Sequence, residues 1–276
     1  MKKVLLATSA LTLSAGFASA DVSMSGSGGA GVFGAAGADL AVYSGVDLGF
    51  ALSGASDNGM TFSAALDMGG GQTLDAGDFE LDTQDMGVDD NASVTIGVAG
   101  VTLVLSQNGV DDLYDDDLAA DIGVSGSMGT LSYSFVTGLE DADPTSLKIG
   151  YAAGAISGSV VSSDSGDAST VSVSYKMGDI TVSAEADTNR AGADTSSVTL
   201  AYKMSDGMSV SIENSEDVNE VSLAYSSGAI SVGVTANDAA ANTWEATMAY
   251  DLGSGATFNL GTNNAETTFA GVGFSF

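Results

Sequence analysis

Apolar and polar residues alternate one by one along most of this chain, and this period of two constrains its fold more than any other feature. From Val171 to Met177 every second residue is apolar, and the residues between them are Ser or Lys. Similar stretches occupy residues 180–187, 197–204, 220–226 and 243–250. Successive side chains of a β-strand point to opposite faces, whereas an α-helix repeats every 3.6 residues, a period that this sequence does not sustain. The sequence therefore predicts an all-β protein whose strands have one apolar and one polar face.

Two kinds of connection alternate between the predicted strands. Short connections that contain Gly, such as Ala153-Gly154 and Ser227-Gly228, are typical of hairpin turns, because Gly readily adopts positive φ. Longer connections are polar and mostly acidic, as in residues 162–168 and 187–194. Each unit thus consists of a strand, a tight turn, a second strand and a longer loop, which places all tight turns at one end.

A tyrosine precedes each tight turn in the C-terminal half of the chain. The five residues are Tyr151, Tyr175, Tyr202, Tyr225 and Tyr250. Their spacings of 24, 27, 23 and 25 residues correspond to one hairpin unit each. Counting hairpins along residues 21–276 predicts one opening strand, eight hairpins and one closing strand, hence 18 strands. A count of 16 stays open, because the N-terminal pattern is the least regular.

The first 20 residues are typical of a secretory signal peptide. Lys2 and Lys3 precede a short, mostly apolar run over residues 4–15, and Ala18-Ser19-Ala20 provides a small-residue cleavage site. The run is too short to cross about 30 Å of hydrocarbon, which requires roughly 20 apolar residues. We therefore expect export, removal of residues 1–20, and a single domain over residues 21–276.

The composition excludes several classes of function. The chain has 36 acidic and 6 basic residues, a formal charge of −30, and neither Cys nor His. Such a charge repels phosphate backbones, so we expect no nucleic-acid partner. Without Cys and His there is no Ser-His-Asp triad and no thiolate or imidazole metal site, so we expect neither an enzyme nor a cofactor.

The polar face of the predicted strands decides between a soluble sandwich and a membrane barrel. It is dominated by Ser, Thr, Gly and Ala, whereas soluble sheets usually carry many Lys and Arg outward, and only four basic residues follow residue 20. The tyrosines lie at one depth, as in an interfacial aromatic girdle, although Tyr also favours strands in general. The sequence predicts a closed antiparallel transmembrane β-barrel of 16–18 strands, apolar outside and polar inside, with short periplasmic turns and longer acidic external loops. Such a bore is too wide for side chains to fill and should hold water.

The end of the chain carries a resemblance to a known family. Residues 267–276 form a predicted strand that ends on Phe276, with Phe274 on the same face. This ending resembles the C-terminal assembly signal of Gram-negative outer-membrane barrels. The chain from Asp21 onward resembles the general porins of the alphaproteobacterial, Rhodobacter-type family. The resembling segments are the signal peptide, Asp21 to Gly26, Leu52 to Phe62 and Ala249 to Ala256.

The resemblance implies a water-filled channel for passive diffusion of ions and small hydrophilic solutes. It also implies a homotrimer, usually of 16-stranded barrels, embedded in outer-membrane lipid by the barrel-assembly machinery after export through the periplasm. Two alternatives belong to other classes. A secreted or surface-layer acidic structural protein or adhesin would explain the composition, and an outer-membrane hydrolase would need catalytic groups that a chain without His lacks.

In the resembling family the third external loop folds inward, and its acidic residues narrow the pore opposite basic residues of the wall. The corresponding stretch here is 107–117, after a strand predicted over Val101 to Ser106. Its acidic residues are Asp111, Asp112, Asp115, Asp116 and Asp117. Three interpretations stay open: a pore constriction, a solvated surface loop, or a divalent-cation site. A strong basic wall cluster is absent, because residues 21–276 contain one Arg and three Lys.

The three lysines alternate with apolar neighbours and are predicted to face the lumen. They are Lys148, Lys176 and Lys203, and the last two precede tight turns. Their expected role is to balance lumen carboxylates, the alternative being decoration of the interface. A second acidic stretch, residues 69–90, is predicted to be the longest external loop. The excess of carboxylates predicts a channel that prefers cations.

Overall fold

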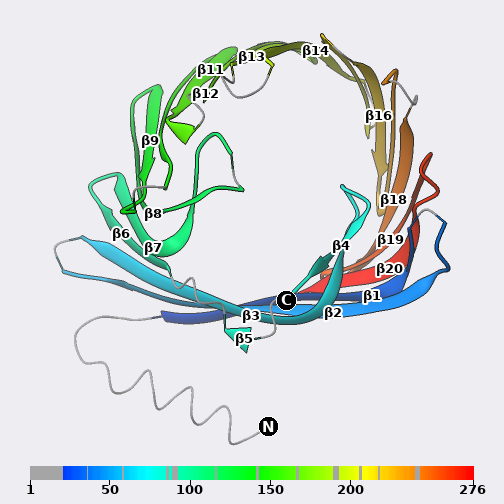
Figure 1. Ribbon diagram of the computed structural model, residues 1–276, viewed down its shortest axis with the longest axis horizontal. Helices are drawn as coiled ribbons and strands as arrows, with labels where there is room; N and C mark the ends of the chain where they lie inside the picture. The colour runs from blue at the N-terminus through cyan, green and yellow to red at the C-terminus, as the bar shows by residue number, and fades with distance from the viewer. Residues whose placement is uncertain are drawn as a thin grey trace, which may run out of the picture.

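The computed structural model describes residues 21–276 except 36, 58, 85–86, 89–92, 116, 141–142, 166–167, 189–192, 205–206, 217 and 240–242. The predicted signal peptide, residues 1–20, lies outside the described residues. Strands account for most of the described chain and form a closed ring around a central bore (Figure 1). In the described part of the chain, no helix has the length and apolar character needed to cross a membrane.

The strands follow one another with short connections. They are β1 (Asp21–Gly34), β2 (Ala41–Ala55), β3 (Thr61–Asp75), β4 (Glu80–Thr83), β5 (Gly87–Val88), β6 (Ser93–Val98), β7 (Val101–Asp111), β8 (Ala119–Met128), β9 (Leu131–Thr137), β10 (Thr145–Ala153), β11 (Ile156–Ser163), β12 (Ala168–Met177), β13 (Ile180–Thr188), β14 (Thr195–Lys203), β15 (Met208–Ser215), β16 (Asn219–Ser227), β17 (Ile230–Asn237), β18 (Trp244–Gly253), β19 (Ala256–Asn263) and β20 (Thr268–Ser275).

The barrel closes because the first and last strands pair. Strand β1 pairs antiparallel with β20, from Ser27 opposite Ser275 to Gly34 opposite Thr268. Each other wall strand pairs with its neighbours in sequence, and β3 pairs with β6. Strands β4 and β5 pair only with β3, so 18 of the 20 strands in the described residues form the wall. The predicted closed antiparallel barrel is confirmed, with 18 wall strands rather than the alternative of 16.

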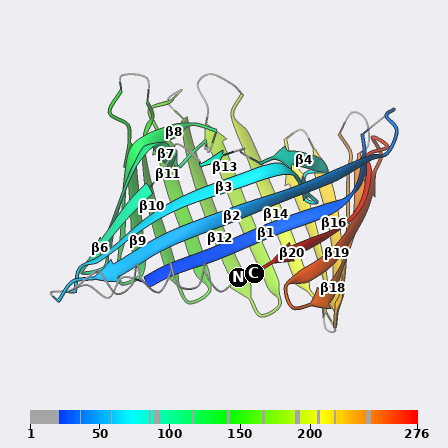
Figure 2. The ribbon, with the colours of Figure 1, turned by 90° about the horizontal axis from the view of Figure 1, so that it is seen from below.

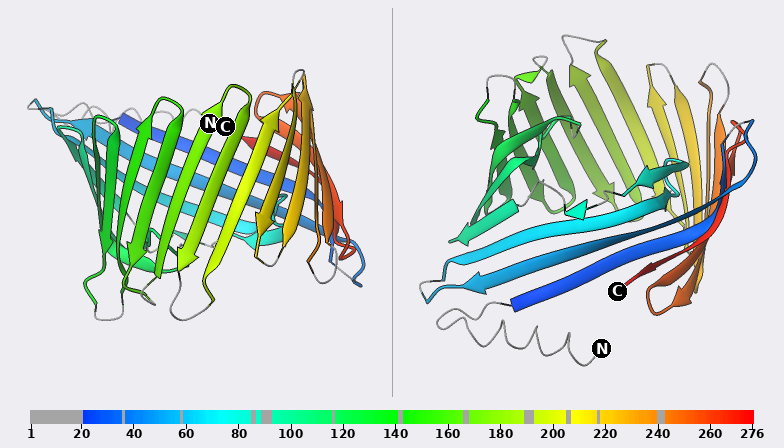
Figure 3. Two further views of the ribbon diagram at one scale, coloured as in Figure 1. Left: turned by 90° about the horizontal axis from the view of Figure 1, so that it is seen from above. Right: turned by 60° about the horizontal axis from the view of Figure 1, so that its bottom comes forward.

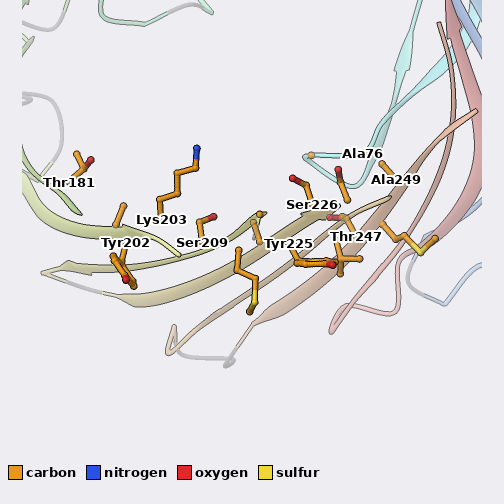
Figure 4. Close-up of a pocket in the computed structure, with 18 of the residues that line it drawn as sticks. Ala76, Thr181, Tyr202, Lys203, Ser209, Tyr225, Ser226, Thr247 and Ala249 are labelled. Atoms are coloured by element: carbon orange, nitrogen blue, oxygen red, sulfur yellow. The ribbon is translucent and has the colours of Figure 1, made fainter. Parts of the chain in front are cut away.

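The alternation seen in the sequence separates the two faces of the wall. Val171, Val173 and Tyr175 of β12 are 49%, 52% and 48% exposed on the outside. In Figure 4, Lys203 and Ser226 point into the bore, whereas Tyr202 and Tyr225 point to the opposite side. Large apolar side chains thus stay uncovered on the outside of the ring, as the sequence predicts for a wall that faces lipid.

The N-terminal part of the wall differs from the rest. Strands β1, β2 and β3 have 14, 15 and 15 residues. They are inclined more strongly than the strands of the opposite wall (Figure 2, Figure 3). On their inner face the ring of Tyr43 lies over β1 and β20, and a Cβ at Gly31 would come within 2.9 Å of it. Glycine at this position therefore lets a buried aromatic ring lie flat against the wall.

Candidate functional site in the barrel interior

Two segments leave the wall and lie inside the ring of strands. One is the connection between β7 and β8, and the other is the hairpin formed by the end of β3 with β4 (Figure 1). An 18-stranded barrel has a bore that wall side chains alone do not fill. The two inward segments therefore determine how much of the bore stays open.

The first inward segment, residues 112–118, begins later than the sequence predicted. Strand β7 continues past Ser106 to Asp111 after a register shift between Leu105 and Val110. Within this shift Asn108 has a positive φ of 51°, and its N–H donates to Asp121 of β8 at 3.0 Å. The bulge hides the continuation of the strand, because the extra residues break the period of two.

Asp112 organises the turn of this segment. Its carboxylate accepts hydrogen bonds from the N–H groups of Tyr114 at 3.1 Å and Asp115 at 3.2 Å. Its own N–H donates to the carbonyl of Leu118 at 2.8 Å. Asp112 is only 5% exposed, so it holds the turn together and does not face the open bore.

Contacts with the wall fix the segment against the inner faces of β10, β11 and β13. The N–H of Leu113 donates to Ser146 of β10 at 3.0 Å, and the hydroxyl of Ser163 on β11 donates to Asp112 at 3.4 Å. Both serines are buried, at 1% and 3% exposure. The hydroxyl of Tyr114 reaches Asp187 of β13 at 2.8 Å. The segment thus extends across the inner wall to the fifth strand beyond β8.

The predicted constriction residues consequently differ from one another. Asp111 and Asp117 are exposed, Asp115 is half-buried, and Asp112 is buried. The N–H of Asp117 donates to the Asp115 carboxylate at 3.2 Å. Asp116 lies outside the described residues. Among the side chains that the structure describes, no group of three or more potential metal ligands is placed to hold a metal ion.

The three predicted lumen lysines are exposed on the inner wall but do not lie together. Lys176 and Lys203 line one cavity of about 910 Å³. Lys148 lines a separate recess of about 340 Å³ near Tyr151 and Gly158. Lys203 extends into the bore in Figure 4. Two of the lysines therefore face one part of the bore and the third faces another.

Carboxylates of the inner wall and of the outer loops are hydrogen-bonded to nearby donors. Glu213 accepts a hydrogen bond from the Thr199 hydroxyl at 3.3 Å. Beyond the end of β17, Asp238 accepts from the backbone N–H of Asn219 at 2.7 Å and from its side-chain amide at 2.8 Å. These two hydrogen bonds hold the pKa of Asp238 below its usual value. Hydrogen bonds of this kind favour the charged form, so this loop stays acidic at neutral pH.

The predicted girdle tyrosines lie in one band near the tight turns. Tyr151, Tyr175, Tyr202, Tyr225 and Tyr250 are all exposed, between 40% and 48%. In the sheet register Tyr202 is opposite Ile180, and Tyr250 is opposite Ile230. An amphipathic ring next to an apolar side chain suits the boundary between lipid and water.

The predicted assembly residues lie at the seam of the barrel. Phe274 and Phe276 are 43% and 64% exposed on the outer face. The N–H of Phe276 donates to the carbonyl of Gly26 at 2.9 Å, and the N–H of Gly26 donates back at 3.0 Å. The last residue of the chain therefore extends the pairing of β20 with β1.

The second inward segment was missed by sequence reasoning, which assigned residues 69–90 to an external loop. Residues 72–83 form a hairpin inside the barrel. Its Phe79 ring packs against Phe269 of β20, with ring centroids 5.3 Å apart. The signals in the sequence were the run Gly69-Gly70-Gly71 and a single aromatic residue in an acidic stretch. Neither signal identifies the distant partner Phe269.

Comparisons with known proteins agree with this architecture. A family model described as Gram-negative porin matches residues 7–270. Three solved variants of the porin of Rh. blastica are similar in structure, with TM-scores of 0.60, 0.61 and 0.60. Each is 16% identical and covers 93% of this chain and 100% of its own. At that identity the likeness shows the fold alone. A comparison with curated proteins gives no match.

Proposed function

The chain belongs to the Gram-negative porin family, and from this premise we propose that its channel passes cations in preference to anions, together with small hydrophilic solutes. As a member of this family it is an outer-membrane channel rather than a member of an enzyme class. The observation that carries the proposed preference is the charge of the interior. Its two inward segments contain exposed carboxylates and no basic residue among those described, and the described wall contributes three lysines.

The shape of the water path strengthens the effect of the acidic side chains on cations. Residues 21–276 contain 36 acidic and four basic side chains. A narrow aqueous path between low-dielectric walls concentrates the field of these charges and raises the local cation concentration. Salt limits the reach of the field, since the Debye length is about 10 Å at 0.1 M and about 3 Å at 1 M. Selectivity should therefore weaken as salt concentration rises.

Within this path we assign the constriction to the segment 112–118 and its flanks. Asp111, Asp115 and Asp117 are the described carboxylates that water reaches, and they are the proposed contacts for passing cations. Asp116 completes this set from the sequence. Asp112 has a different role, because its oxygens are engaged by backbone N–H groups and by Ser163.

The proposed function includes roles for the two ends of the chain in export and assembly. Residues 1–20 direct export and are then removed, and Phe274 and Phe276 present the last strand to the barrel-assembly machinery. The mature barrel is proposed to assemble as a homotrimer in outer-membrane lipid, with its tyrosine band at the periplasmic interface. The exposed apolar outer face supports this arrangement over a secreted structural protein, which would have to cover that face in water.

Reversal potentials in planar bilayers test the function directly. With a KCl gradient around 0.1 M, the purified protein should give a potential of the sign for a cation-selective channel. The potential should shrink when the same concentration ratio is centred on 1 M. A channel selective for anions at 0.1 M would overturn the electrostatic argument. Protein that is folded by heat-modifiable gel mobility but forms no channel would overturn the function itself.

A further inference from the structure

The hairpin of β3 and β4 leaves the wall at a defined point. Strand β3 pairs with β2 as far as Gly71 opposite Gly45. Beyond that point it pairs with β4 alone, from Gln72 opposite Thr83 to Asp75 opposite Glu80. Figure 1 shows β4 and the turn before it inside the ring. About half of the acidic stretch 69–90 thus forms a β-hairpin inside the bore.

Two glycines make this departure possible. Gly71 has a φ of +82°, a conformation that residues with a Cβ rarely adopt. At Gly45 of the neighbouring strand, a Cβ would come within 2.5 Å of the backbone of Gln72. The inward bend therefore depends on glycine both in the bending strand and in the strand it leaves.

Internal hydrogen bonds make the hairpin a rigid unit. At its tip the N–H groups of Gly77 and Asp78 donate to the carboxylate of Asp75, at 2.8 and 3.3 Å. At its base the Gln84 side chain donates to the Thr73 hydroxyl at 2.8 Å. The backbone N–H of Gln84 donates to the carbonyl of Gly71 at 2.9 Å. The hairpin is therefore closed at both ends.

An aromatic contact fixes the hairpin to the far side of the seam. Phe79 and Phe269 are 7% and 1% exposed, and their rings are tilted by 59° with centroids 5.3 Å apart. This tilted arrangement is one that aromatic pairs favour. Phe79 adopts a positive φ of 59°, a conformation that persists only where the surroundings enforce it. Phe79 is thus the anchor that holds the hairpin to the wall.

The tip of the hairpin forms one side of a recess in the bore. Ala76 and Gly77 line the cavity of about 910 Å³ together with Lys176 and Lys203. Ser226 of the wall lines the same cavity and is labelled with Ala76 in Figure 4. The segment 112–118 lies elsewhere, over β10, β11 and β13. A solute in this cavity therefore passes between the hairpin tip and the wall.

We propose that the β3–β4 hairpin is a second constriction element, and that its position, held by Phe79 on Phe269, sets the size limit for solutes that pass along the wall from β12 to β19. This inference rests on the proposed channel function and adds to it a size-determining element that is distinct from the segment 112–118. In this arrangement Ala76 and Gly77 form the inner edge of the opening, and Phe79 determines how far that edge stands from the wall.

Because the chain has no cysteine, a single thiol placed on the hairpin tip tests the proposal. The reference is the unmodified Ala76→Cys channel itself, and a bulky neutral methanethiosulfonate reagent should lower its single-channel conductance by at least one third. The matched control is Ala155→Cys, because Ala155 is exposed in the tight turn between β10 and β11. Its modification, verified by mass, should change conductance by less than a tenth.

A second variant tests the anchor. Phe79→Ala leaves every wall strand intact and should raise both the conductance and the largest sugar that enters proteoliposomes in swelling assays. Complete modification of Ala76→Cys without a fall in conductance would overturn the proposal, as would Phe79→Ala with an unchanged size limit. If the unaltered, folded chain forms no channel, the proposed function fails and this inference fails with it. The two outcomes above differ from that case, because in both of them the unaltered chain does form a channel.

Discussion

The hydroxyl of Tyr114 donates a hydrogen bond of 2.8 Å to the carboxylate of Asp187, a residue 73 positions later in the chain and on a different part of the wall. The other oxygen of the same carboxylate accepts a hydrogen bond from Thr170. One wall carboxylate thus connects the inward segment 112–118 to both β12 and β13. The position of the segment therefore depends on this interaction as well as on its own turn.

Removing the Tyr114 hydroxyl should loosen the segment without unfolding the barrel. Tyr114→Phe loses a hydrogen bond to a carboxylate, an interaction worth about 1.5–3 kcal/mol. We expect larger current fluctuations in single-channel recordings and unchanged heat-modifiable mobility. Tyr175→Phe, which alters a tyrosine on the outer face, serves as the control and should leave the current trace unchanged. Equal noise in both variants would contradict a role for this contact.

The exposed acidic residues of the segment should carry much of the cation preference. Replacing Asp111, Asp115, Asp116 and Asp117 by Asn, with Asp112 retained, removes charge but keeps the turn. The reversal potential across a KCl gradient at 0.1 M should fall by at least a third. Asp57→Asn in the β2–β3 turn is the control for a distant charge. An unchanged potential in the fourfold variant would indicate that the segment does not border the ion path.

The two faces of β14 should differ in their tolerance of charge. Leu200 is 46% exposed on the outer face, whereas Thr199 on the inner face donates a hydrogen bond to Glu213. An Arg that faces lipid near the bilayer midplane costs about 2–4 kcal/mol. Leu200→Arg should therefore lower the free energy of unfolding in lipid vesicles more than Thr199→Arg. The reverse order would mean that the faces are interchanged.

The final residue should matter for assembly more than for the stability of the finished wall. Deleting Phe276 removes the two hydrogen bonds to Gly26 and one exposed ring at the seam. We expect less heat-modifiable protein in the outer membrane, measured by gel densitometry of membrane fractions. Leu252→Ala, a change at another exposed apolar residue near a tight turn, is the control. Equal yields of the deletion variant and the unaltered chain would argue against a terminal signal.

The wall could be predicted from the sequence because the residues that define each strand and each tight turn are neighbours in the chain. The alternation within each strand shows which residues lie on which face. A turn glycine such as Gly154, with φ of +59°, shows where the preceding strand ends. The alternating stretch 180–187 and the observed β13, Ile180–Thr188, differ by one residue. Regular alternation thus determines most strand boundaries without reference to distant residues.

The interior could not be predicted in the same way, because its contacts join distant parts of the chain. Phe79 and Phe269 are 190 positions apart, and nothing near Phe79 indicates which wall strand it meets. The five aspartates near residue 112 look alike in the sequence. Among the four described ones, only Asp112 is buried, and its carboxylate accepts from Ser163 and from the N–H groups of Tyr114 and Asp115.

The pairing of β1 with β20 sets an order of events for the folding of this chain. Every other strand pairing in the described wall joins strands that are near in sequence, but the seam joins residue 26 to residue 276. Until the last strand arrives, the sheet has two unpaired edges, at which any other strand could add. The described wall therefore stays open to mispairing until β20 has paired with β1, so closure depends on two strands from opposite ends of the sheet.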